Sequence, residues 1–457
     1  MSDCDDVVML LNIFKSVGID MNMKDKDGNT PLMKAIIEIN INLVSALIKF
    51  GADANKQDLG GWTALMYTTQ RRGVIATEML RLLLDAGADA NKQDKYGNTA
   101  LMLAAQEGGE HGAGMVRLLV DAGADTNKQE EDGRTALMFA TMHGDEHAAG
   151  MIHVLVDAGA NVNKQSQNGW TALMGIAKYG REHATGMMRF LIKAGADTNK
   201  QNKDGWTALI LTAKHSGEHE HAAGMMHLLL DAGADANKQT KYGWTALSMV
   251  ADNGGEHAVE MIKLLLDKEV DANKQDGGEA LRFSVHKGEP GLSMMRLLLD
   301  KGADVNKQSN CGWTALMETV QYEGEHDVHV IHTLVNFGAD INIKNKINKT
   351  AYDIAVEKKN KLAICILEQY KANWIFSWTA KNPIQLKLWS EQNIQSVRDI
   401  TKYWEEHDQS GFGKLPWEII RDIILPMTID RRDTIKLIKK EEEKKISSRP
   451  CKRAKIH

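Results

Sequence analysis

The sequence has few cysteines, no basic leader and no long apolar run. The four cysteines, at positions 4, 311, 365 and 451, are scattered along the chain. A disulfide framework is therefore not expected, and a reducing compartment is favoured. The first residues, MSDCDDVVMLL, are acidic where a secretory signal is basic. Because no apolar run approaches the roughly 20 residues that span a bilayer, we expect an intracellular, cytoplasmic protein that makes no membrane contact.

Motifs of common catalytic and metal sites are also absent from the sequence. It contains no P-loop, no G-x-S-x-G elbow, no H-E-x-x-H and no paired-cysteine zinc motif. We therefore expect a protein that is not an enzyme and that uses no cofactor or metal.

Charge is unevenly distributed along the chain. The net charge is -5 overall, but the segment Arg431 to His457 holds eleven Lys and Arg against four Asp and Glu. The rest of the chain therefore carries about -12. An acidic body of this kind argues against a nucleic-acid partner.

One sequence motif recurs along most of the chain. Its fullest form reads GWTALM, then GEHA-x-GM, then LLLDAGAD-x-NKQ, and the copies near Thr99, Thr135, Thr171 and Thr207 are 36 residues apart. A fixed period of this size is typical of a stacked solenoid. Because a solenoid offers a long surface rather than a deep pocket, the pattern favours binding to other macromolecules.

The copy at residues 94–129 shows what each unit contains. Thr99 is placed to cap a first helix with a narrow face of small residues. The segment Gly108–His111 is expected to break that helix, and a bulkier apolar stripe then predicts a second helix. Gly123 is expected to end it in a left-handed conformation. A polar finger, residues 125–129, leads into the next unit.

Turn, small helix, loop, large helix and finger together resemble the ankyrin repeat, whose first helix normally starts G-x-T-P-L-H. The resemblance covers residues 1–371 and implies an all-α solenoid of about ten repeats. Two features depart from the family pattern: Met usually replaces the histidine, and most copies are about three residues longer than 33. The positions equivalent to the capping threonine are Thr30, Thr63, Thr99, Thr135, Thr171, Thr207, Thr245, Glu279, Thr314 and Thr350.

The eighth copy is irregular. Its turn reads DGGEAL, so Glu279 stands in place of the capping threonine, and Glu269 replaces the glycine that ends the previous second helix. Losing such a glycine cap costs on the order of 1 kcal/mol. We expect either a bend or weak point in this copy or a drifted repeat that still packs normally.

Aromatic residues recur beside the capping threonine and are the candidate partner-binding residues. In ankyrin folds the position just before that threonine faces a concave groove. Exposed Trp and Tyr dominate interface energetics, so we expect them to contact a partner; the alternative is that each ring only stiffens the stack. The aromatic ladder consists of Trp62, Tyr96, Trp170, Tyr179, Trp206, Tyr242, Trp244, Trp313 and Tyr322.

Two further rows recur once per repeat. A lysine in each NKQ finger could attract an acidic partner, but neighbouring aspartates favour a solvated face. Glu-His pairs such as Glu110/His111 carry groups that ligate metals and transfer protons. Identical pairs in successive repeats favour a structural role in the loops, and a pH-responsive row is the alternative.

The periodic pattern ends near residue 371. We expect a helical extension at 372–408, a linker at 409–414, a helical segment at 415–445 and a basic tail at 446–457. The sequence LPWEIIRDIIL predicts a short apolar helix from Leu415 to Leu425. The tail is compatible with nuclear import and equally with ordinary solubility.

This C-terminal helix resembles the start of an F-box, whose signature is L-P-x-E-[IL]-x-x-x-I-[IL]. The matching residues are Leu415, Pro416, Glu418, Ile419, Ile423 and Ile424. A shortened F-box after ankyrin repeats resembles the PRANC architecture of poxviruses and similar proteins of other large DNA viruses. The resemblance implies docking to the Skp adaptor of a cullin-RING ubiquitin ligase, with a helix that only seals the solenoid as the alternative.

These observations together predict an adaptor that recruits a target protein through the aromatic ladder and presents it to a ubiquitin ligase. The alternative is a non-catalytic scaffold that binds or sequesters its target without ligase docking.

Overall fold

The computed structural model describes residues 20–379 apart from 72, 144, 218–220, 256, 269, 271, 274–276 and 322–326, with the side chains of 277–279 and 371–379 also excepted. The chain divides into two compact units, Met1–Ile364 and Cys365–His457. The described residues form twenty helices and no β-strand. The predicted all-α solenoid is confirmed, and the helices fall into ten pairs.

Each pair begins with a short first helix. These are α2 Pro31–Ile37, α4 Ala64–Thr69, α6 Ala100–Glu107, α8 Ala136–Ala140, α10 Ala172–Tyr179, α12 Ala208–Lys214, α14 Ala246–Asn253, α16 Gly277–Ser284, α18 Ala315–Thr319 and α20 Ala351–Lys358. Each pair ends with a second helix that is longer than the first. They are α3 Ile41–Lys49, α5 Val74–Asp85, α7 Gly109–Asp121, α9 Glu146–Asp157, α11 Ala184–Lys193, α13 Ala222–Asp231, α15 Ala258–Asp267, α17 Gly288–Asp300, α19 Asp327–Asn336 and α21 Lys361–Thr379.

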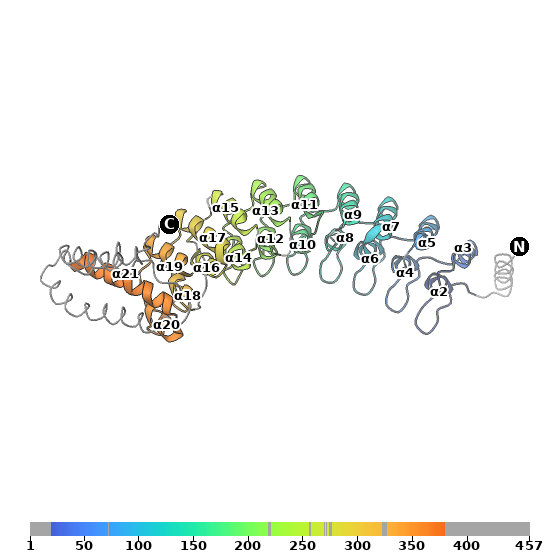
Figure 1. Cartoon of the computed structure of the whole chain (residues 1–457). Helices are drawn as coiled ribbons and strands as arrows, with labels where there is room; N and C mark the ends of the chain where they lie inside the picture. The colour runs from blue at the N-terminus through green and yellow to red at the C-terminus, as the bar shows by residue number, and fades with distance from the viewer. Residues whose placement is uncertain are drawn as a thin grey trace, which may run out of the picture. The chain divides into compact units, whose positions relative to one another are not determined.

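The nine pairs from α2 to α19 stack side by side within the first unit. From α2 to α15 the first helices form one row and the second helices another, and the finger loops extend beyond the first row (Figure 1). The predicted boundary after residue 371 falls inside α21, and the later boundaries lie outside the described residues, so the domain division stays a prediction.

The capping threonines act as the sequence predicts. The side chain of Thr99 accepts a hydrogen bond from the backbone N–H of Met102 at 3.3 Å, and α6 begins at the next residue, Ala100. Such a cap satisfies one of the donors that a helix N-terminus leaves without a partner. The same bond is made by Thr30, Thr63, Thr135, Thr171, Thr207, Thr245, Thr314 and Thr350.

Methionines fill the space between the two helix rows. Met66, Met102 and Met174, at the position where the family usually has histidine, are at most 1% exposed. Met115 and Met151, on the second helices, are equally buried. The flexible, unbranched side chain suits the irregular gaps between stacked helices.

One expectation about the loop was wrong. Gly108–His111 was expected to interrupt the helices as a unit, but only Gly108, at φ 65°, does so. The second helix α7 already begins at Gly109, so Glu110 lies in its first turn. A carboxylate is favourable there because the helix dipole places positive charge at the N-terminus.

The asparagine of each NKQ finger ties one repeat to the next. Asn127 donates from Nδ2 to the carbonyl of Gly159 at 3.0 Å and accepts from the N–H of Asn161 at 2.7 Å. Gly159 directly follows the C-cap of α9, so this bond ties the finger to the end of the second helix in the next repeat. The same pair of bonds is made by Asn55, Asn91, Asn163, Asn199, Asn273 and Asn306.

The glutamine two positions later forms a second row of ties. Gln93 donates from Nε2 to the carbonyl of Gly97 in its own finger and to that of Gln129 in the next one. The backbones of the finger tips are also bonded, for example from the N–H of Lys95 to the carbonyl of Gly60 at 3.0 Å. From Gln57 to Gln239, the fingers of successive repeats are therefore joined into one hydrogen-bonded edge, which we call the finger edge.

The eighth repeat packs its helices but differs in these ties. Ala280 and Leu281 of α16 are at most 1% exposed, and their counterparts in the third repeat, Ala100 and Leu101, are at most 2% exposed. Within the described residues, Val270 lacks the N–H bond that Ala234 makes to the carbonyl of Leu229. Nε2 of Gln239, in the finger that precedes α14, is buried without a described hydrogen-bond partner. The drifted-repeat alternative therefore holds for the helices, and a weak point at the finger stays a prediction.

Candidate protein-binding face

The five ladder tryptophans are held in one position relative to their fingers. The backbone N–H of Trp206 donates to Oδ1 of Asn202 at 2.9 Å, and the backbone N–H of Trp313 donates to Oγ of Ser309 at 3.1 Å. In the same way, the backbone N–H groups of Trp62, Trp170 and Trp244 donate to the side-chain oxygens of Asp58, Ser166 and Thr240. All five indoles are half-buried, each directly before the first helix of its repeat.

Four of these rings contact a side chain on a first helix. The ammonium group of Lys178 lies 5.2 Å from the ring centroid of Trp170, and that of Lys214 lies 4.6 Å from Trp206. A cation over an indole face is attracted by the ring quadrupole. Trp62 meets Tyr67 at 5.3 Å, and Trp244 stacks on Phe283 of the next repeat at 5.3 Å and 11°.

The hydroxyl group of Tyr67, beside Trp62, makes two hydrogen bonds. Tyr67 donates to Oδ2 of Asp58 at 2.6 Å, and its oxygen lies 3.1 Å from Oδ1 of Asn29. Burial and the nearby carboxylate raise the pKa of Tyr67 above its ordinary value. The phenol therefore stays neutral and joins the first two repeats on this face.

The ladder tyrosines are more exposed than the tryptophans. Tyr96 and Tyr242 are 63% and 76% exposed at their finger tips, and Tyr179 at the end of α10 is 36% exposed. Tyr322 lies outside the described residues. The partner contact expected of the ladder stays a prediction, because half-buried tryptophans suit both a binding role and a stiffening role.

Sequence reasoning missed two exposed apolar side chains near the finger tips. Leu59 is 62% exposed and Ile347 is 65% exposed. Ile347 occupies the position of Tyr96 and Tyr242, so aligning the repeats by their threonines would have found it.

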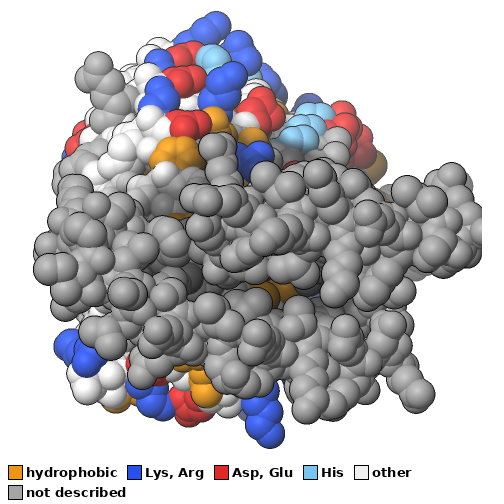
Figure 2. Space-filling view, turned by 60° about the vertical axis from the view of Figure 1, so that its left-hand side comes forward, with side chains coloured by type: hydrophobic (Ala, Val, Ile, Leu, Met, Phe, Trp, Pro, Cys, Tyr) orange, Lys and Arg blue, Asp and Glu red, His pale blue; other side chains and the backbone are white. Residues whose placement is uncertain are grey.

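The finger lysines bind within the stack. The ammonium groups of Lys128, Lys164 and Lys238 donate to Oε1 of the NKQ glutamine of the preceding repeat at 3.2–3.5 Å. Acidic, basic and histidine side chains are also interspersed on the described surface visible in Figure 2. These three lysines are thus hydrogen-bonded within the finger edge.

The Glu-His pairs of the fourth and fifth repeats line one shared pocket. Its volume is about 580 Å³. Glu146 and His147 line it with Glu182 and His183 of the next repeat. Across the part of the chain that the structure describes, no three such side chains converge as metal ligands.

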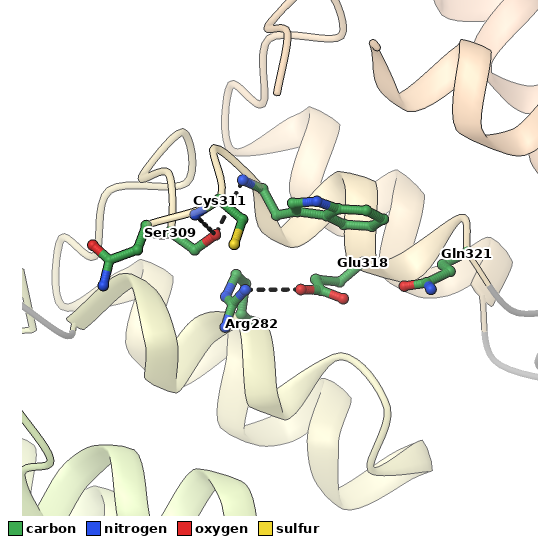
Figure 3. A pocket seen from close by; sticks show the side chains of 7 residues that line it. Arg282, Ser309, Cys311, Glu318 and Gln321 are labelled. Atoms are coloured by element: carbon green, nitrogen blue, oxygen red, sulfur yellow. Dashed lines mark hydrogen bonds and ion pairs between the residues drawn. The ribbon is translucent and has the colours of Figure 1, made fainter. Parts of the chain in front are cut away.

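A second pocket, which we call the notch, lies between the eighth and ninth repeats and has a volume of about 340 Å³. Nη1 of Arg282 pairs with Oε1 of Glu318 at 2.8 Å, and their side chains are only 15% and 21% exposed. In Figure 3 the carboxylate of Glu318 lies between Arg282 and Gln321. The notch is lined by Arg282, Ser309, Asn310, Cys311, Trp313, Glu318 and Gln321.

The F-box-like residues cannot be placed on this face. Leu415, Pro416, Glu418, Ile419, Ile423 and Ile424 all lie outside the described residues. Among the helices that are described, none combines the length and hydropathy needed to cross a membrane.

Part of the chain is similar to two proteins, a plant potassium channel and a solved ankyrin repeat domain. It is 41% identical over 54 residues to the potassium channel AKT1 of Oryza sativa, in both the indica and the japonica subspecies. The match covers 12% of the chain and only 6% of the channel. The solved ankyrin repeat domain of Bcl-3, a member of the IkappaB protein family, is 22% identical with a TM-score of 0.41, covering 52% of this chain and all of that domain.

A family model covers far more of the sequence. The model described as ankyrin repeats in three copies matches residues 2–94, 73–163, 147–223, 218–309 and 289–374. These matches cover the helices from α2 to α20, the first part of α21 and the nine capping threonines. The chain belongs to the ankyrin repeat family, a family of non-catalytic scaffolds for protein–protein interaction.

Proposed function

We propose that this protein is an adaptor that recruits a target protein to a host cullin-RING ubiquitin ligase. The target binds along the aromatic ladder, and the helix from Leu415 to Leu425 docks on the Skp adaptor. Holding both partners on one chain raises the effective concentration of the target at the ligase, so the chain itself needs no chemistry. Such an adaptor works inside the cell, in the cytoplasm or, through its basic tail, in the nucleus.

The target-binding half of the proposal is supported by the exposed aromatic groups on a rigid edge. Tyr96 and Tyr242 are largely exposed, and the Asn and Gln ties hold their fingers in register. Rigid aromatic side chains contribute large contact areas at a small cost in conformational entropy.

The ligase half rests on a single observation, the six-residue match to the F-box signature from Leu415 to Ile424. The alternative function is a scaffold that sequesters its target without a ligase. The solenoid accounts for that alternative equally well, so binding to Skp distinguishes the two functions.

The experiment is a calorimetric titration in which purified Skp is added to the purified full-length chain and the heat of binding is measured. We expect saturable binding that the double change Leu415→Ala and Pro416→Ala abolishes. The matched control is Ile446→Ala with Ile456→Ala, which removes similar apolar groups from the tail outside the motif. Absence of binding by the unaltered chain would leave the sequestering scaffold as the function.

A further inference from the structure

Three consecutive ladder tryptophans carry hydrogen-bond donors that the fold does not use. Among the described residues, no acceptor pairs with the indole Nε1–H of Trp170, Trp206 or Trp244. All three rings are half-buried, and their nitrogens are not among the buried polar atoms that lack a partner. Each indole N–H therefore reaches solvent and is available to an acceptor from another molecule.

The side chains that contact these rings leave the donors accessible. The ammonium group of Lys214 lies over the ring of Trp206, and Trp170 has an ammonium group over its ring in the same way. Phe283 stacks on Trp244 with 11° between the ring planes. Each of these neighbours covers a face of the indole, whereas the N–H lies at the positive edge of the ring.

The three donors recur once per repeat along the stack. The backbone N–H of each tryptophan donates to the side chain four positions earlier, so each indole starts from the same point of its finger. The helices that follow, α10, α12 and α14, pack on one another in sequence (Figure 1). Packed helices lie about 8–10 Å apart, so the indole donors recur at about that interval.

An extended backbone of the polyproline II type presents acceptors at the same interval. It rises about 3.1 Å per residue with three residues per turn, so one face recurs about every 9.3 Å, and its carbonyls have no internal partner. An α-helix has a pitch of about 5.4 Å and its carbonyls are already bonded. One face of a β-strand recurs about every 6.8 Å. Proline-rich segments also dock on aromatic grooves at a low entropic cost, because their conformation is preformed.

The charge on this stretch favours an acidic residue in the ligand. Lys214 is exposed and makes no ion pair among the described residues. Its ammonium group acts over a screening length of about 8 Å at physiological ionic strength, so this local cation and not the acidic body attracts the nearest ligand side chain. A long polyanion such as a nucleic acid would extend onto the acidic body and is disfavoured.

We propose that Trp170, Trp206 and Trp244 bind a proline-rich segment of the target protein that is in the polyproline II conformation and carries an acidic residue. The proposal deepens the target-binding half of the proposed function and rests on it for the existence of a target. Backbone carbonyls three residues apart accept from the indole N–H groups, and proline rings pack on the half-buried indoles. A carboxylate of the segment pairs with Lys214.

The test measures the fluorescence anisotropy of dye-labelled probes as the purified full-length chain is added. The main probe is a blocked peptide of four Pro-Pro-Glu units, which spans about 37 Å as polyproline II and so reaches all three donors. Its comparisons are peptides of four Pro-Pro-Lys units and four Gly-Ser-Glu units, and a single-stranded thymidine 12-mer. We expect saturable binding of the Pro-Pro-Glu peptide with a Kd on the order of 0.1 mM, and binding at least about fivefold weaker for the other three probes.

Two variants separate the donor from the charge. Trp206→Phe keeps an aromatic ring and removes the N–H, so it should weaken binding of the Pro-Pro-Glu peptide about three- to tenfold. Lys214→Gln should weaken the same peptide and have little effect on a neutral peptide of four Pro-Pro-Gln units. The matched control is Trp62→Phe, because two repeats with Asn98 and Arg134 at the ladder position separate Trp62 from the other tryptophans. Cooperative melting shows that each variant is folded.

The proposal is overturned if the Pro-Pro-Glu peptide does not bind, or if the Gly-Ser-Glu peptide, the Pro-Pro-Lys peptide or the DNA binds as tightly. It is also overturned if Trp206→Phe binds the peptide no more weakly than Trp62→Phe does. Failure of the ligase half of the proposed function appears separately, as absence of Skp binding. A chain that binds Skp and not the Pro-Pro-Glu peptide therefore refutes this proposal alone.

Discussion

At the residue scale, the capping threonines can be tested one at a time. Thr171 accepts the N–H of Met174 at 3.3 Å and is 4% exposed, so water cannot replace its oxygen easily. Thr171→Ala should lower the free energy of unfolding by about 1 kcal/mol. Urea unfolding measures the change, and Thr171→Ser, which keeps the oxygen, should recover most of the loss. Equal losses in both variants would mean that the methyl group and not the hydroxyl stabilises the turn.

His286, which follows α16, gives a prediction of pH dependence. Burial, and then the charges of Lys287 and Arg282, lower the pKa of this imidazole below its ordinary value of 6.5. The folded chain therefore holds a proton there less readily than the unfolded chain does. Its contribution to stability is present above pH about 6.5 and is lost as the pH falls through the folded pKa.

The corresponding experiment compares two chains at two pH values. Between pH about 7.5 and 5.5, His286→Gln should lose less unfolding free energy than the unaltered chain, because one source of proton linkage is gone. Urea titrations give both values. The same loss in both chains would contradict a lowered pKa for His286.

At the element scale, the finger asparagines should stabilise the interface between neighbouring repeats, in addition to the packing of their helices. Asn127→Ala removes two bonds between the fourth repeat and its neighbour and should cost about 1–2 kcal/mol. Asn127→Asp keeps the acceptor for the N–H of Asn161 and should cost less. Hydrogen exchange at the amide of Asn161 reports the bond directly, and unchanged protection in Asn127→Ala would argue against the tie.

The eighth repeat should be the least protected part of the finger edge. Among the described bonds, none from Val270 to Leu265 corresponds to the bond from Ala234 to Leu229, and Gln239 lacks the described partners that Gln201 has. Peptides covering 277–287 should therefore exchange faster than peptides covering 246–256 in the seventh repeat. Hydrogen exchange followed by mass spectrometry tests this, and equal rates would support a drifted repeat of normal stability.

The helices could be predicted from the sequence because their signals are local. A threonine before Ala-Leu-Met and a glycine after the second apolar stripe each act within one turn, and Thr99 and Gly123 behave as expected. The finger ties could not be foreseen, because the partners of Gln93 and Asn127 lie 36 and 32 residues away. The notch also escaped notice, since Arg282 and Glu318 come from different repeats and meet only in the stack.

At the scale of the whole molecule, the stack keeps two kinds of surface apart. Leu65, Met66 and Leu80 lie in the core between the helix rows, whereas Tyr96 and Tyr242 face solvent at the finger tips. Because repeats contact only their neighbours, a change on the exposed surface should affect binding with little effect on distant repeats. Target binding and ligase docking should therefore be separable by mutation.

The measurement that tests this most directly is quantitative mass spectrometry of proteins co-purified with three forms of the full-length chain from proteasome-inhibited cells. The forms are unaltered, Trp170→Ala with Trp206→Ala, and Leu415→Ala with Pro416→Ala, each first shown to melt cooperatively. We expect the ladder variant to retain Skp and lose a defined target, and the motif variant to retain that target and lose Skp. Loss of both partners in either variant, or a target indifferent to the ladder, would contradict an adaptor with two separate surfaces.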